Sequence, residues 1–540
     1  MPTNVKENGF ESSIVSWLVQ HNGYEQGSNA DYNKEIAMDE TRLFRFLNTT
    51  QADKMKQLRL ENDPLEKEKF LQRLDQSLHT NGVIDLLRKG FRYKHLVLDM
   101  FYVRPSPGNE TAAKLYAQNI FSVTRQLQYS RQNPLLALDV CLFLNGLPIA
   151  TMELKNQLTK QNAADAVKQY KDERTPDEVL FGFKRCIVHF AVDDNEVRMC
   201  TELKGQKSWF LPFNKGYNDG AGNPPNPDGI KTDYLWKEIL RKDDFSNIIE
   251  NYVQIICDED EETHKKSYKQ IFPRYHQLQL VTSLLADAKR DGVGKRYLIQ
   301  HSAGSGKSNS IAWLAHQLVT LKDATDHNIF DTVIVVTDRV NLDKQIRNTI
   351  RQFMQVSSTV GWAKDSSELG TLLEKGTKII ITIVHKFQFI LEDISKLHTN
   401  RSFAILIDEA HSSQNGDLST KMNIVLSGSE YDNDDLLEDK INTLIDGKKL
   451  AKNASYFAFT ATPKNKTLEV FGREEIQPDG SKRFFPHYVY TMKQAIEEHF
   501  IMDVLRYYTP IQSFYKLSKT VEDDPLFDKK KAQRLLRYYV

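Results

Sequence analysis

Two apolar runs separated by a turn signal stand out in the first third of the chain. Residues 135–144 (LLALDVCLFL) and 147–154 (LPIATMEL) flank Asn145 and Gly146. An Asn-Gly pair between apolar runs is a strong β-hairpin signal, because both residues tolerate the positive φ angles of a tight turn. The pattern therefore predicts two antiparallel strands, each interrupted by a single carboxylate.

The segments around this hairpin follow other patterns. Residues 1–130 read mostly as helices with polar joints, and residues 186–191 and 196–203 read as a second strand pair. The stretch 216–229 (GYNDGAGNPPNPDG) is rich in Gly, Pro and Asn, which disfavour both helix and strand. We therefore expect a mixed α/β domain followed by a long loop.

From residue 266 onward, strands and helices alternate. Helical stretches separate short apolar runs, and this alternation predicts right-handed βαβ units and a parallel sheet. The expected strands are 297–300, 332–337, 378–384, 403–407 and 455–460.

Composition narrows the classes of protein that fit. Lys and Arg number 72, as do Asp and Glu, so the net charge is zero and DNA binding would need local basic grooves. The four cysteines lie far apart without a CxxC pair, which argues against a zinc site or disulfide framework and favours a reducing cytoplasm. No apolar stretch approaches about 18 residues and no secretory signal is evident, so we expect a cytoplasmic protein without membrane contact.

The hairpin carries residues suited to metal-dependent cleavage of phosphodiesters. Mg²⁺ prefers oxygen ligands, and Asp139 and Glu153 are expected to supply two carboxylates. Lys155 lies two residues beyond Glu153, on the same strand face, where it could orient the attacking water or stabilise charge on the phosphate. An unpaired charge inside an apolar strand is costly, which favours this reading over a hairpin with solvent-facing charges.

Such a site requires one particular strand register. A two-residue turn at Asn145-Gly146 would pair Asp139 with residue 152 and place the acid on the wrong face. A three-residue turn, with Gly146 in the left-handed region, would pair Asp139 with Glu153. We therefore predict the longer or bulged turn.

A strand, a Gly-containing loop and an expected helix follow at 297–308 (YLIQHSAGSGKS). Backbone N–H groups of such a loop cradle phosphates at a helix N-terminus. Lys307 is expected to contact the β- and γ-phosphates of ATP, and Ser308 to hold Mg²⁺. His301 stands where the Walker A pattern has its first Gly, a replacement that superfamily 2 motors tolerate. The expected nucleotide-binding residues of the loop are Ser302, Ala303, Gly304, Ser305, Gly306, Lys307 and Ser308.

The apolar strand FAILI ends in two carboxylates, Asp408 and Glu409. Two acids at the carboxyl end of a parallel strand suit a nucleotide site. Asp408 is expected to hold Mg²⁺ through water and Glu409 to polarise the attacking water, whereas His411 would couple ATP to DNA. The alternative is an ordinary acidic helix N-cap.

Shorter motifs follow in the order of superfamily 2 motors. Residues 272–277 (FPRYHQ) resemble a Q motif, in which Gln277 would read adenine. Residues 335–345 and 380–387 resemble DNA-contacting motifs, and Thr460-Ala461-Thr462 resembles motif III, which links ATP state to DNA. Each of these motifs is weak evidence alone, but their occurrence in this order supports a superfamily 2 motor.

Together these segments resemble the R subunit of type I restriction enzymes. The resemblance also runs through NGLPIATMELKN, WFLPFNKGYNDGAGNP and DYLWK, and it covers most of residues 1–500. It implies a PD-(D/E)xK nuclease, ATP-driven translocation of double-stranded DNA, cleavage away from the recognition site, and a complex with modification (M) and specificity (S) subunits. The family's QxxxY pair has no match, since Gln169 directly precedes Tyr170, which puts Gln169 in doubt. Glu11 is a further acidic candidate.

The resemblance predicts an α/β fold in which a PD-(D/E)xK nuclease domain (1–250) precedes a RecA-like parallel-sheet motor lobe (266–495). Residues 251–265 contain the acidic run DEDEE and are expected to form a solvated linker. Residues 496–540 would begin an incomplete second lobe. Because no later motif with an arginine finger is present, we expect a fragment or truncated product that binds ATP weakly and shows little DNA-stimulated hydrolysis.

Two alternatives stay open. The chain could be a stand-alone nuclease-helicase of DNA repair or phage defence, which would need no methylase partner. It could also be a truncated chain that only binds DNA, although the intact Asp139, Glu153 and Lys155 argue for residual nuclease competence. Type III restriction subunits share the motor, but their nuclease follows it, which is the reverse of the order here.

Overall fold

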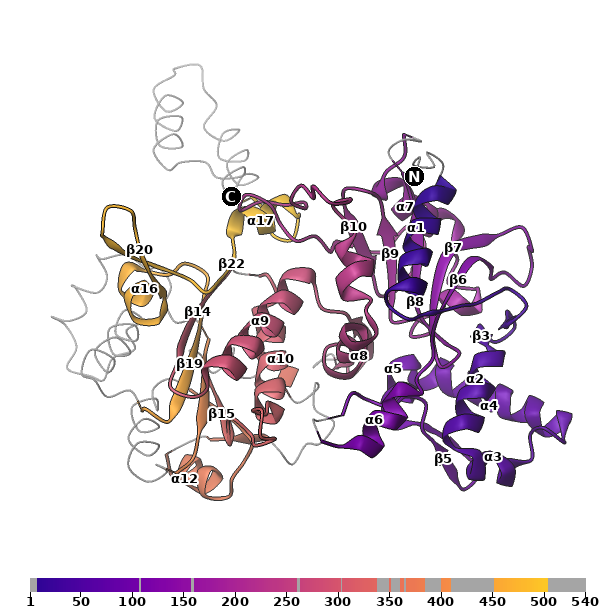
Figure 1. The fold of residues 1–540 in the computed structure, drawn as a ribbon, viewed down its shortest axis with the longest axis horizontal. Helices are drawn as coiled ribbons and strands as arrows, with labels where there is room; N and C mark the ends of the chain where they lie inside the picture. Colours follow the sequence, from indigo (N-terminus) through magenta and orange to yellow (C-terminus); the bar gives the residue numbers. More distant parts are fainter. Residues whose placement is uncertain are drawn as a thin grey trace, which may run out of the picture.

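Two seven-stranded sheets organise the protein, the N-terminal one on the right of Figure 1 and the C-terminal one on the left. The computed structural model describes residues 7–105, 108–156, 160–259, 263–302, 304–337, 349–350, 360–363, 366–383, 400–408 and 451–503.

The N-terminal sheet is mixed, and its strand order is β1-β6-β7-β8-β9-β10-β11. Its central strand β8 pairs antiparallel with β7 and parallel with β9, and all eight of its residues are buried. The two strand pairs predicted from the apolar runs are confirmed. The strands are β1 (Glu25–Gln26), β6 (Phe121–Gln128), β7 (Ala137–Leu144), β8 (Leu147–Leu154), β9 (Val188–Val192), β10 (Val197–Cys200) and β11 (Leu211–Pro212).

Helices pack around this sheet, as the sequence predicted for residues 1–130. The longest, α4, shows how local signals set their ends: the Asp63 side chain accepts from the Glu66 N–H, Pro64 opens the helix, and Gly82 follows it at φ 89°. The helices are α1 (Glu7–Gln20), α2 (Glu40–Thr50), α3 (Ala52–Leu58), α4 (Pro64–Asn81), α5 (Val83–Lys89), α6 (Glu110–Ala117), α7 (Ala163–Glu173) and α8 (Lys242–Asn251). Short ribbons β2–β3 (Tyr32–Asn33, Met38–Asp39) and β4–β5 (Phe91–Tyr93, Leu96–Leu98) lie between them.

The β7–β8 hairpin has the predicted register, and a bulge in β8 rather than a longer turn produces it. Leu144 pairs with Leu147, so the turn has only two residues, Asn145 and Gly146, at φ 51° and 84°. The ladder then shifts between Leu142 and Phe143, where β8 contributes one extra residue. Val140 consequently pairs with Met152, and Asp139 and Glu153 come next along the ladder. The predicted register is confirmed. Of the two predicted ways of reaching it, the three-residue turn is wrong, because both turn residues adopt the positive φ that Asn-Gly favours, whereas a bulge is present but lies in β8 beyond the turn.

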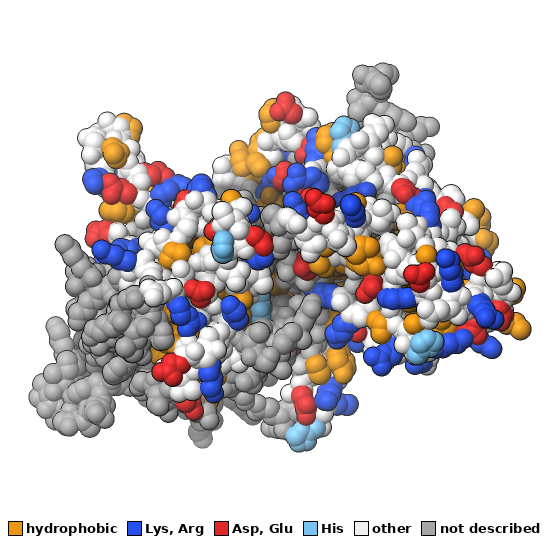
Figure 2. Space-filling model, turned by 60° about the horizontal axis from the view of Figure 1, so that its bottom comes forward, with side chains coloured by type: hydrophobic (Ala, Val, Ile, Leu, Met, Phe, Trp, Pro, Cys, Tyr) orange, Lys and Arg blue, Asp and Glu red, His pale blue; other side chains and the backbone are white. Residues whose placement is uncertain are grey.

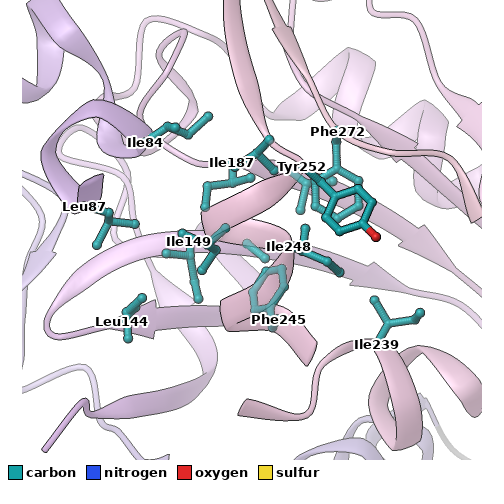
Figure 3. Close-up of a cluster of buried hydrophobic side chains, with 14 of the residues drawn as sticks. Ile84, Leu87, Leu144, Ile149, Ile187, Ile239, Phe245, Ile248, Tyr252 and Phe272 are labelled. Atoms are coloured by element: carbon teal, nitrogen blue, oxygen red, sulfur yellow. The ribbon is translucent and has the colours of Figure 1, made fainter. Parts of the chain in front are cut away.

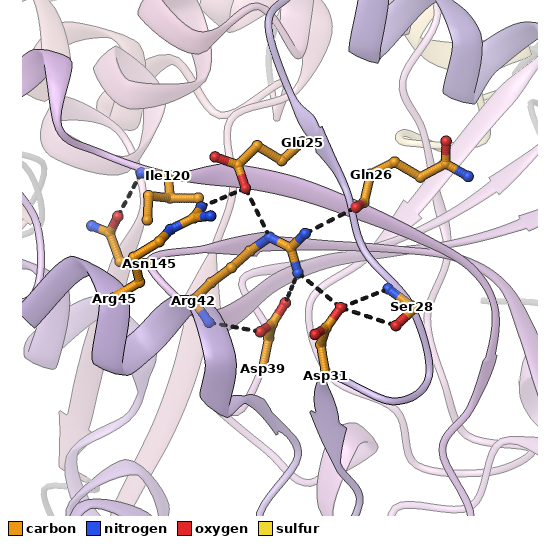
Figure 4. A network of polar contacts seen from close by, with 9 residues as sticks. All are labelled: Glu25, Gln26, Ser28, Asp31, Asp39, Arg42, Arg45, Ile120 and Asn145. Carbon is orange, nitrogen blue, oxygen red and sulfur yellow. Dashed lines mark hydrogen bonds and ion pairs between the residues drawn. The ribbon is translucent and has the colours of Figure 1, made fainter. Parts of the chain in front are cut away.

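Buried contacts hold this turn in place. The Asn145 side chain accepts from the Ile120 N–H at 2.7 Å and donates to the Met100 carbonyl at 2.9 Å. Gly146 has no room for a side chain, because a Cβ would lie 2.4 Å from the Asp39 carbonyl oxygen. Beside it, the Arg42 guanidinium gathers the carboxylates of Glu25, Asp31 and Asp39 (Figure 4).

The C-terminal sheet is parallel at every described pairing, with strand order β16-β17-β15-β18-β19-β14-β22. The five strands predicted for this region are confirmed, and the edge strands β16 and β22 are additions. The strands are β14 (Arg296–His301), β15 (Thr332–Thr337), β16 (Val360–Trp362), β17 (Ile379–Ile383), β18 (Phe403–Ile407), β19 (Ala454–Thr460) and β22 (Tyr488–Tyr490). The helices of this part are α9 (Tyr275–Asp291), α10 (Lys307–Thr320), α12 (Ser366–Glu374), α16 (Asn465–Phe471) and α17 (Met492–Glu497), and β20–β21 (Arg473–Ile476, Lys482–Phe485) form a separate ribbon.

The junction between the two sheets is packed rather than solvated. Tyr252 and Val253 are fully buried, and the Trp313 indole N–H of α10 donates to the Tyr252 carbonyl at 2.9 Å. Strand β12 (Gln254–Glu259) then pairs with β13 (Lys266–Ile271). The expectation of a solvated linker over 251–265 is therefore wrong for its first half. Figure 3 shows the adjoining apolar cluster, with labelled residues Ile84, Leu87, Leu144, Ile149, Ile187, Ile239, Phe245, Ile248, Tyr252 and Phe272.

The predicted loop after residue 216 contacts the C-terminal part of the protein. The Thr491 hydroxyl donates to the Asp219 carbonyl at 2.7 Å, and the Ala221 N–H donates to a Glu497 carboxylate oxygen at 2.8 Å. Helix α17 crosses the domain boundary expected at 495/496, so the packed lobe extends at least to this helix. None of the helices in the described part of the chain combines the length and apolar character that a membrane span requires.

Candidate functional site

The carboxyl end of β8 brings together the three residues predicted for nuclease chemistry. Glu153 is fully buried, and the Asp139 carboxylate on the neighbouring strand accepts from the Leu154 N–H at 2.8 Å. Lys155 is also buried, and its backbone N–H donates to the Val192 carbonyl at 2.8 Å. The charges of Asp139 and Lys155 both act on Glu153, so the three side chains share one electrostatic environment.

The burial and hydrogen bonding of Glu153 suit one of its carboxylate oxygens to bind a cation. Burial, followed by the charge of Asp139, raises the pKa of Glu153 to about 8, although Arg174 and Lys155 act in the opposite direction. Its Oε2 atom is buried and makes no hydrogen bond. Among the described residues no group of three or more His, Cys, Asp or Glu side chains forms a metal cage. Two carboxylates fit Mg²⁺, which usually keeps several waters and binds through one or two acids and substrate phosphates.

Arg174 also belongs to this site, although the sequence analysis did not predict it. Its Nε lies 2.6 Å from Glu153 Oε1, and both side chains are almost completely buried. The same guanidinium donates to the Tyr129 hydroxyl at 3.0 Å and to the Ala137 carbonyl at 2.9 Å. An arginine at the end of an amphipathic helix is usually exposed, so no local pattern singles this residue out.

Gln126, which the sequence did not indicate as a site residue, links Glu11 to Asp139. Glu11 is buried on α1 and accepts from Arg125 Nε at 2.7 Å and from Gln126 Nε2 at 3.0 Å. The same amide nitrogen donates to Asp139 Oδ1 at 3.2 Å. Gln126 has φ 45° inside β6, a backbone conformation that side-chain-bearing residues rarely adopt.

Helix α7 presents Tyr170 rather than Gln169 to the sheet. The Tyr170 hydroxyl lies 2.8 Å from Thr151 Oγ1 on β8, and its ring is fully buried. Gln169 is half-buried, so the doubt about its role stands.

The loop after β14 has the form expected of a phosphate cradle. Gly304 and Gly306 adopt φ 73° and 85°, and Gly306 caps the N-terminus of α10. Positive φ turns successive backbone N–H groups toward a common point at the helix start, where the dipole favours anions. Ser305 is held by its backbone bond to Ser302 at 3.3 Å, and Ser308 lies half-buried in the first turn of α10.

The two motor motifs meet, although they belong to strands that are not neighbours. Lys307 Nζ lies 3.3 Å from Asp408 Oδ1. Asp408 directly follows β18, which β19 separates from β14 in the sheet. The arrangement places a lysine, an acid and a helix N-terminus at one sheet edge, which suits Mg²⁺ and a nucleotide polyphosphate. Ala303, Glu409, His411 and most of the two predicted DNA-contacting motifs lie outside the described residues.

Gln277 contacts the phosphate loop itself. Its amide donates to the Gly306 carbonyl at 3.0 Å and accepts from the Arg274 N–H at 3.0 Å. Gln277 and Gly306 also line a cavity of about 350 Å³ that Trp209 borders. Adenine recognition by Gln277 stays a prediction, for which the neighbouring cavity leaves room.

Burial of His301 beside this loop makes the free energy of unfolding depend on pH. Burial, followed by the charges of Lys307 and Arg274, lowers the pKa of His301 to about 3. Between pH 6.5 and that value the unfolded chain binds a proton that the folded chain excludes, so the free energy of unfolding falls as the pH falls. At pH 5.5 we expect this histidine to cost about 1.4 kcal/mol relative to pH 7.5, measured by urea unfolding.

The matched control for this prediction is His301→Gln. Other groups titrate alike in both proteins, so the variant should lose less stability over the same pH interval by about 1.4 kcal/mol. An identical loss in both proteins would show that His301 is not the group responsible.

Two family models match successive parts of the chain. Residues 4–208 match the family model of the type I restriction enzyme R protein N terminus, and residues 276–534 match that of the SWI2/SNF2 ATPase. The chain is therefore similar to an R-protein N-terminal domain followed by a SWI2/SNF2 ATPase domain. The carboxylates of β7 and β8 fall in the part that matches the R-protein model, and Gln277, the phosphate loop and Asp408 fall in the part that matches the ATPase model.

The curated relatives are named as endonuclease subunits of type I restriction enzymes. The chain is 26% identical to the type I restriction enzyme HindI endonuclease subunit of Haemophilus influenzae over 66% of its own length and 33% of the relative's. It is 25% identical to the SauMSSORF170P endonuclease subunit of Staphylococcus aureus (strain MSSA476), over 86% and 45%. It therefore spans less than half the length of these relatives. A solved HsdR fragment from Vibrio vulnificus YJ016 aligns at 15% identity over 67% of this chain and 51% of that one, with a TM-score of 0.26, too low to bear on the fold.

Proposed function

We propose that this chain is an R subunit of a type I restriction enzyme, which uses ATP to translocate double-stranded DNA and cleaves it with the help of Mg²⁺. The observation that carries the proposal is the presence of two sites in one chain, in this order. At the first site, Glu153 is buried with an unsatisfied oxygen beside the half-buried Asp139; at the second, Lys307 and Asp408 form an ion pair at the phosphate loop.

In the nuclease site, each side chain has a task that its position suits. Asp139 and Glu153 would hold the cation from adjacent strands, and Lys155 would place a positive charge against the phosphate on the same face. Burial of Glu153 and Lys155 strengthens these interactions, because water screens them less. A bound Mg²⁺ would polarise the phosphate and provide an activated water.

In the motor site, the backbone N–H groups at the start of α10 would bind the phosphates of ATP. Lys307 would neutralise the β- and γ-phosphates, and Ser308 and Asp408 would hold Mg²⁺. Glu409 is assigned the polarisation of the attacking water from its place next to Asp408 in the sequence.

DNA binding by a chain of zero net charge depends on local basic surface. On the N-terminal domain, a groove of about 650 Å³ is lined by Lys69, Arg73, Arg92 and Lys94. Figure 2 shows Lys and Arg side chains gathered along the lower right edge of this domain, among scattered acidic residues. Phosphate contacts are local, so such a groove supports double-stranded DNA as substrate.

The complete enzyme would also contain M and S subunits, which would recognise and methylate the DNA. The curated relatives are themselves named as endonuclease subunits of type I restriction enzymes. Association with a methylase distinguishes this proposal from a stand-alone nuclease-helicase.

A plasmid assay tests the nuclease half of the proposal. We expect the chain to convert supercoiled plasmid to nicked or linear DNA in Mg²⁺, and EDTA to stop the reaction, because two carboxylates alone cannot activate water for phosphodiester attack. Cleavage that persists in EDTA, or a folded chain that leaves the plasmid intact with its M and S partners, ATP and Mg²⁺ present, would contradict the proposal.

A further inference from the structure

A buried ion pair at the nuclease site involves only one oxygen of its carboxylate. Arg174 Nε lies 2.6 Å from Glu153 Oε1, and the two side chains are 2% and 0% exposed. The second oxygen, Oε2, is equally buried and has no hydrogen-bond partner. A bidentate pair, in which two N–H groups meet both oxygens, is the common and stronger arrangement for arginine. Here the geometry leaves half of the carboxylate for another positive partner.

Arg174 is itself fixed from several sides. Its Nη1 donates to the Tyr129 hydroxyl at 3.0 Å, and its Nη2 donates to the Ala137 carbonyl at 2.9 Å. Tyr129 directly follows β6, Ala137 begins β7, and Glu153 lies near the end of β8. The guanidinium therefore ties together three adjacent strands at the edge of the sheet where Asp139 and Glu153 meet.

We propose that Arg174 is a positioning residue of the nuclease site: it holds Glu153 by Oε1 and thereby presents Oε2, next to Asp139, to the catalytic cation. This inference rests on the proposed metal-dependent nuclease function. Mg²⁺ demands near-ideal octahedral geometry, so a ligand that is already oriented binds it more tightly. Arg174 and Lys155 also offset the two carboxylates, which allows the acids to share a buried site before the cation arrives.

The same contact has an opposite explanation that can be tested directly. Arg174 could occupy the cation's own place, so that it competes with the metal for Glu153. Two observations favour positioning over competition. The guanidinium is bound to Tyr129 and Ala137 as well as Glu153, and a side chain so held cannot withdraw without breaking those bonds. The free oxygen, Oε2, also remains within the buried site.

Metal affinity in the absence of DNA separates these explanations. We would measure Mn²⁺ binding by calorimetry for the wild-type chain, Arg174→Met and Arg174→Lys, and titrate Mg²⁺ in the plasmid assay. We expect Arg174→Met to weaken Mn²⁺ binding about tenfold and to raise the Mg²⁺ concentration for half-maximal cleavage to a similar extent. Arg174→Lys keeps the charge without the three-way contact and should fall between the two.

Arg185→Met is the matched control. Arg185 is another buried arginine of this domain, paired with Asp75, outside the acidic site. It should lose fold stability without a change in Mn²⁺ affinity, which separates loss of packing from loss of ligand orientation. If Arg174→Met does not fold, Arg174→Lys against Arg185→Met supplies the same comparison.

Each outcome decides one of the two claims. Unchanged or tighter Mn²⁺ binding in the Arg174 variants, with normal wild-type binding and cleavage, overturns the positioning role and leaves the nuclease function intact. A wild-type chain that binds no Mn²⁺, or binds it equally well after Glu153→Gln, overturns both the metal site and the inference.

Discussion

Replacing Lys155 by alanine is expected to lower Mg²⁺-dependent DNA cleavage by about 100- to 1,000-fold, the usual cost of removing one charge-stabilising group from a buried site. Lys155 follows β8 two residues after Glu153, on the same face, and it is buried where its charge acts on that acid. ATP binding at Lys307 should not change, because that residue begins helix α10, which packs in the C-terminal part of the protein around the other sheet. Plasmid cleavage and binding of a fluorescent ATP analogue would be measured on the same preparation.

Lys168→Ala is the control for the Lys155 variant. Lys168 is exposed on α7, within the same domain, and its removal changes the net charge by the same amount. It should cleave DNA as the wild-type chain does. A folded Lys155→Ala protein that still cuts DNA would disprove the assigned role, and one that loses both activities would disprove the separation into two sites.

The second large effect is expected at the phosphate loop. Lys307→Ala should weaken ATP binding by about 10- to 100-fold and remove the small amount of ATP hydrolysis expected of this chain, because charged contacts to phosphate are worth about 1.5–3 kcal/mol. The variant also removes the 3.3 Å ion pair with Asp408, the acid expected to hold Mg²⁺. Steady-state hydrolysis with DNA and titration of the fluorescent analogue report the two effects.

Lys322→Ala provides the corresponding control in the motor lobe. Lys322 follows α10 and forms an exposed ion pair with Asp326, so its loss should alter neither measurement. Mg²⁺-dependent nicking that does not require ATP should survive in Lys307→Ala. Wild-type ATP affinity in Lys307→Ala would mean that this loop does not bind the nucleotide.

The parallel sheet was the most predictable part of the fold. Strands such as β15 and β18 are buried on both faces, so they read as continuous apolar runs bounded by polar residues. The carboxyl ends of parallel strands lie at one sheet edge, which is why Lys307, after β14, and Asp408, after β18, were both expected at a nucleotide site. The edge strand β22 was missed because it has only three residues, Tyr488–Tyr490, and alternates in burial.

The strand register of the acidic hairpin was predicted correctly, but the position of the extra residue within it was not. The need to place Asp139 and Glu153 on one face required an extra residue somewhere between the turn and the acids. Local patterns could not say whether that residue would enlarge the turn or enter a strand. The Asn-Gly pair formed its preferred two-residue turn, so the extra residue went into β8.

Residues defined by long-range contacts were beyond sequence reasoning. Arg174 meets Glu153 across 21 positions and Gln126 meets Glu11 across 115, and neither pair has a periodic or motif signature. The failed linker prediction has the same cause. The acidic run after Tyr252 suggested solvent exposure, whereas Tyr252 itself packs against Trp313, 61 positions away.

Because of the extra residue in β8, the position of the hairpin turn and the pairing of the two acids are fixed by separate contacts. Asn145 and its buried partners anchor the tip, while the Asp139 carboxylate is anchored by the Leu154 N–H at the far end. The bulge between these two anchors can absorb a change of one residue in the length of β8. Losing one residue there would simply straighten the ladder and leave Asp139 facing Glu153. A chain with one residue fewer in this strand would therefore keep Asp139 opposite Glu153, which a uniform ladder would not permit.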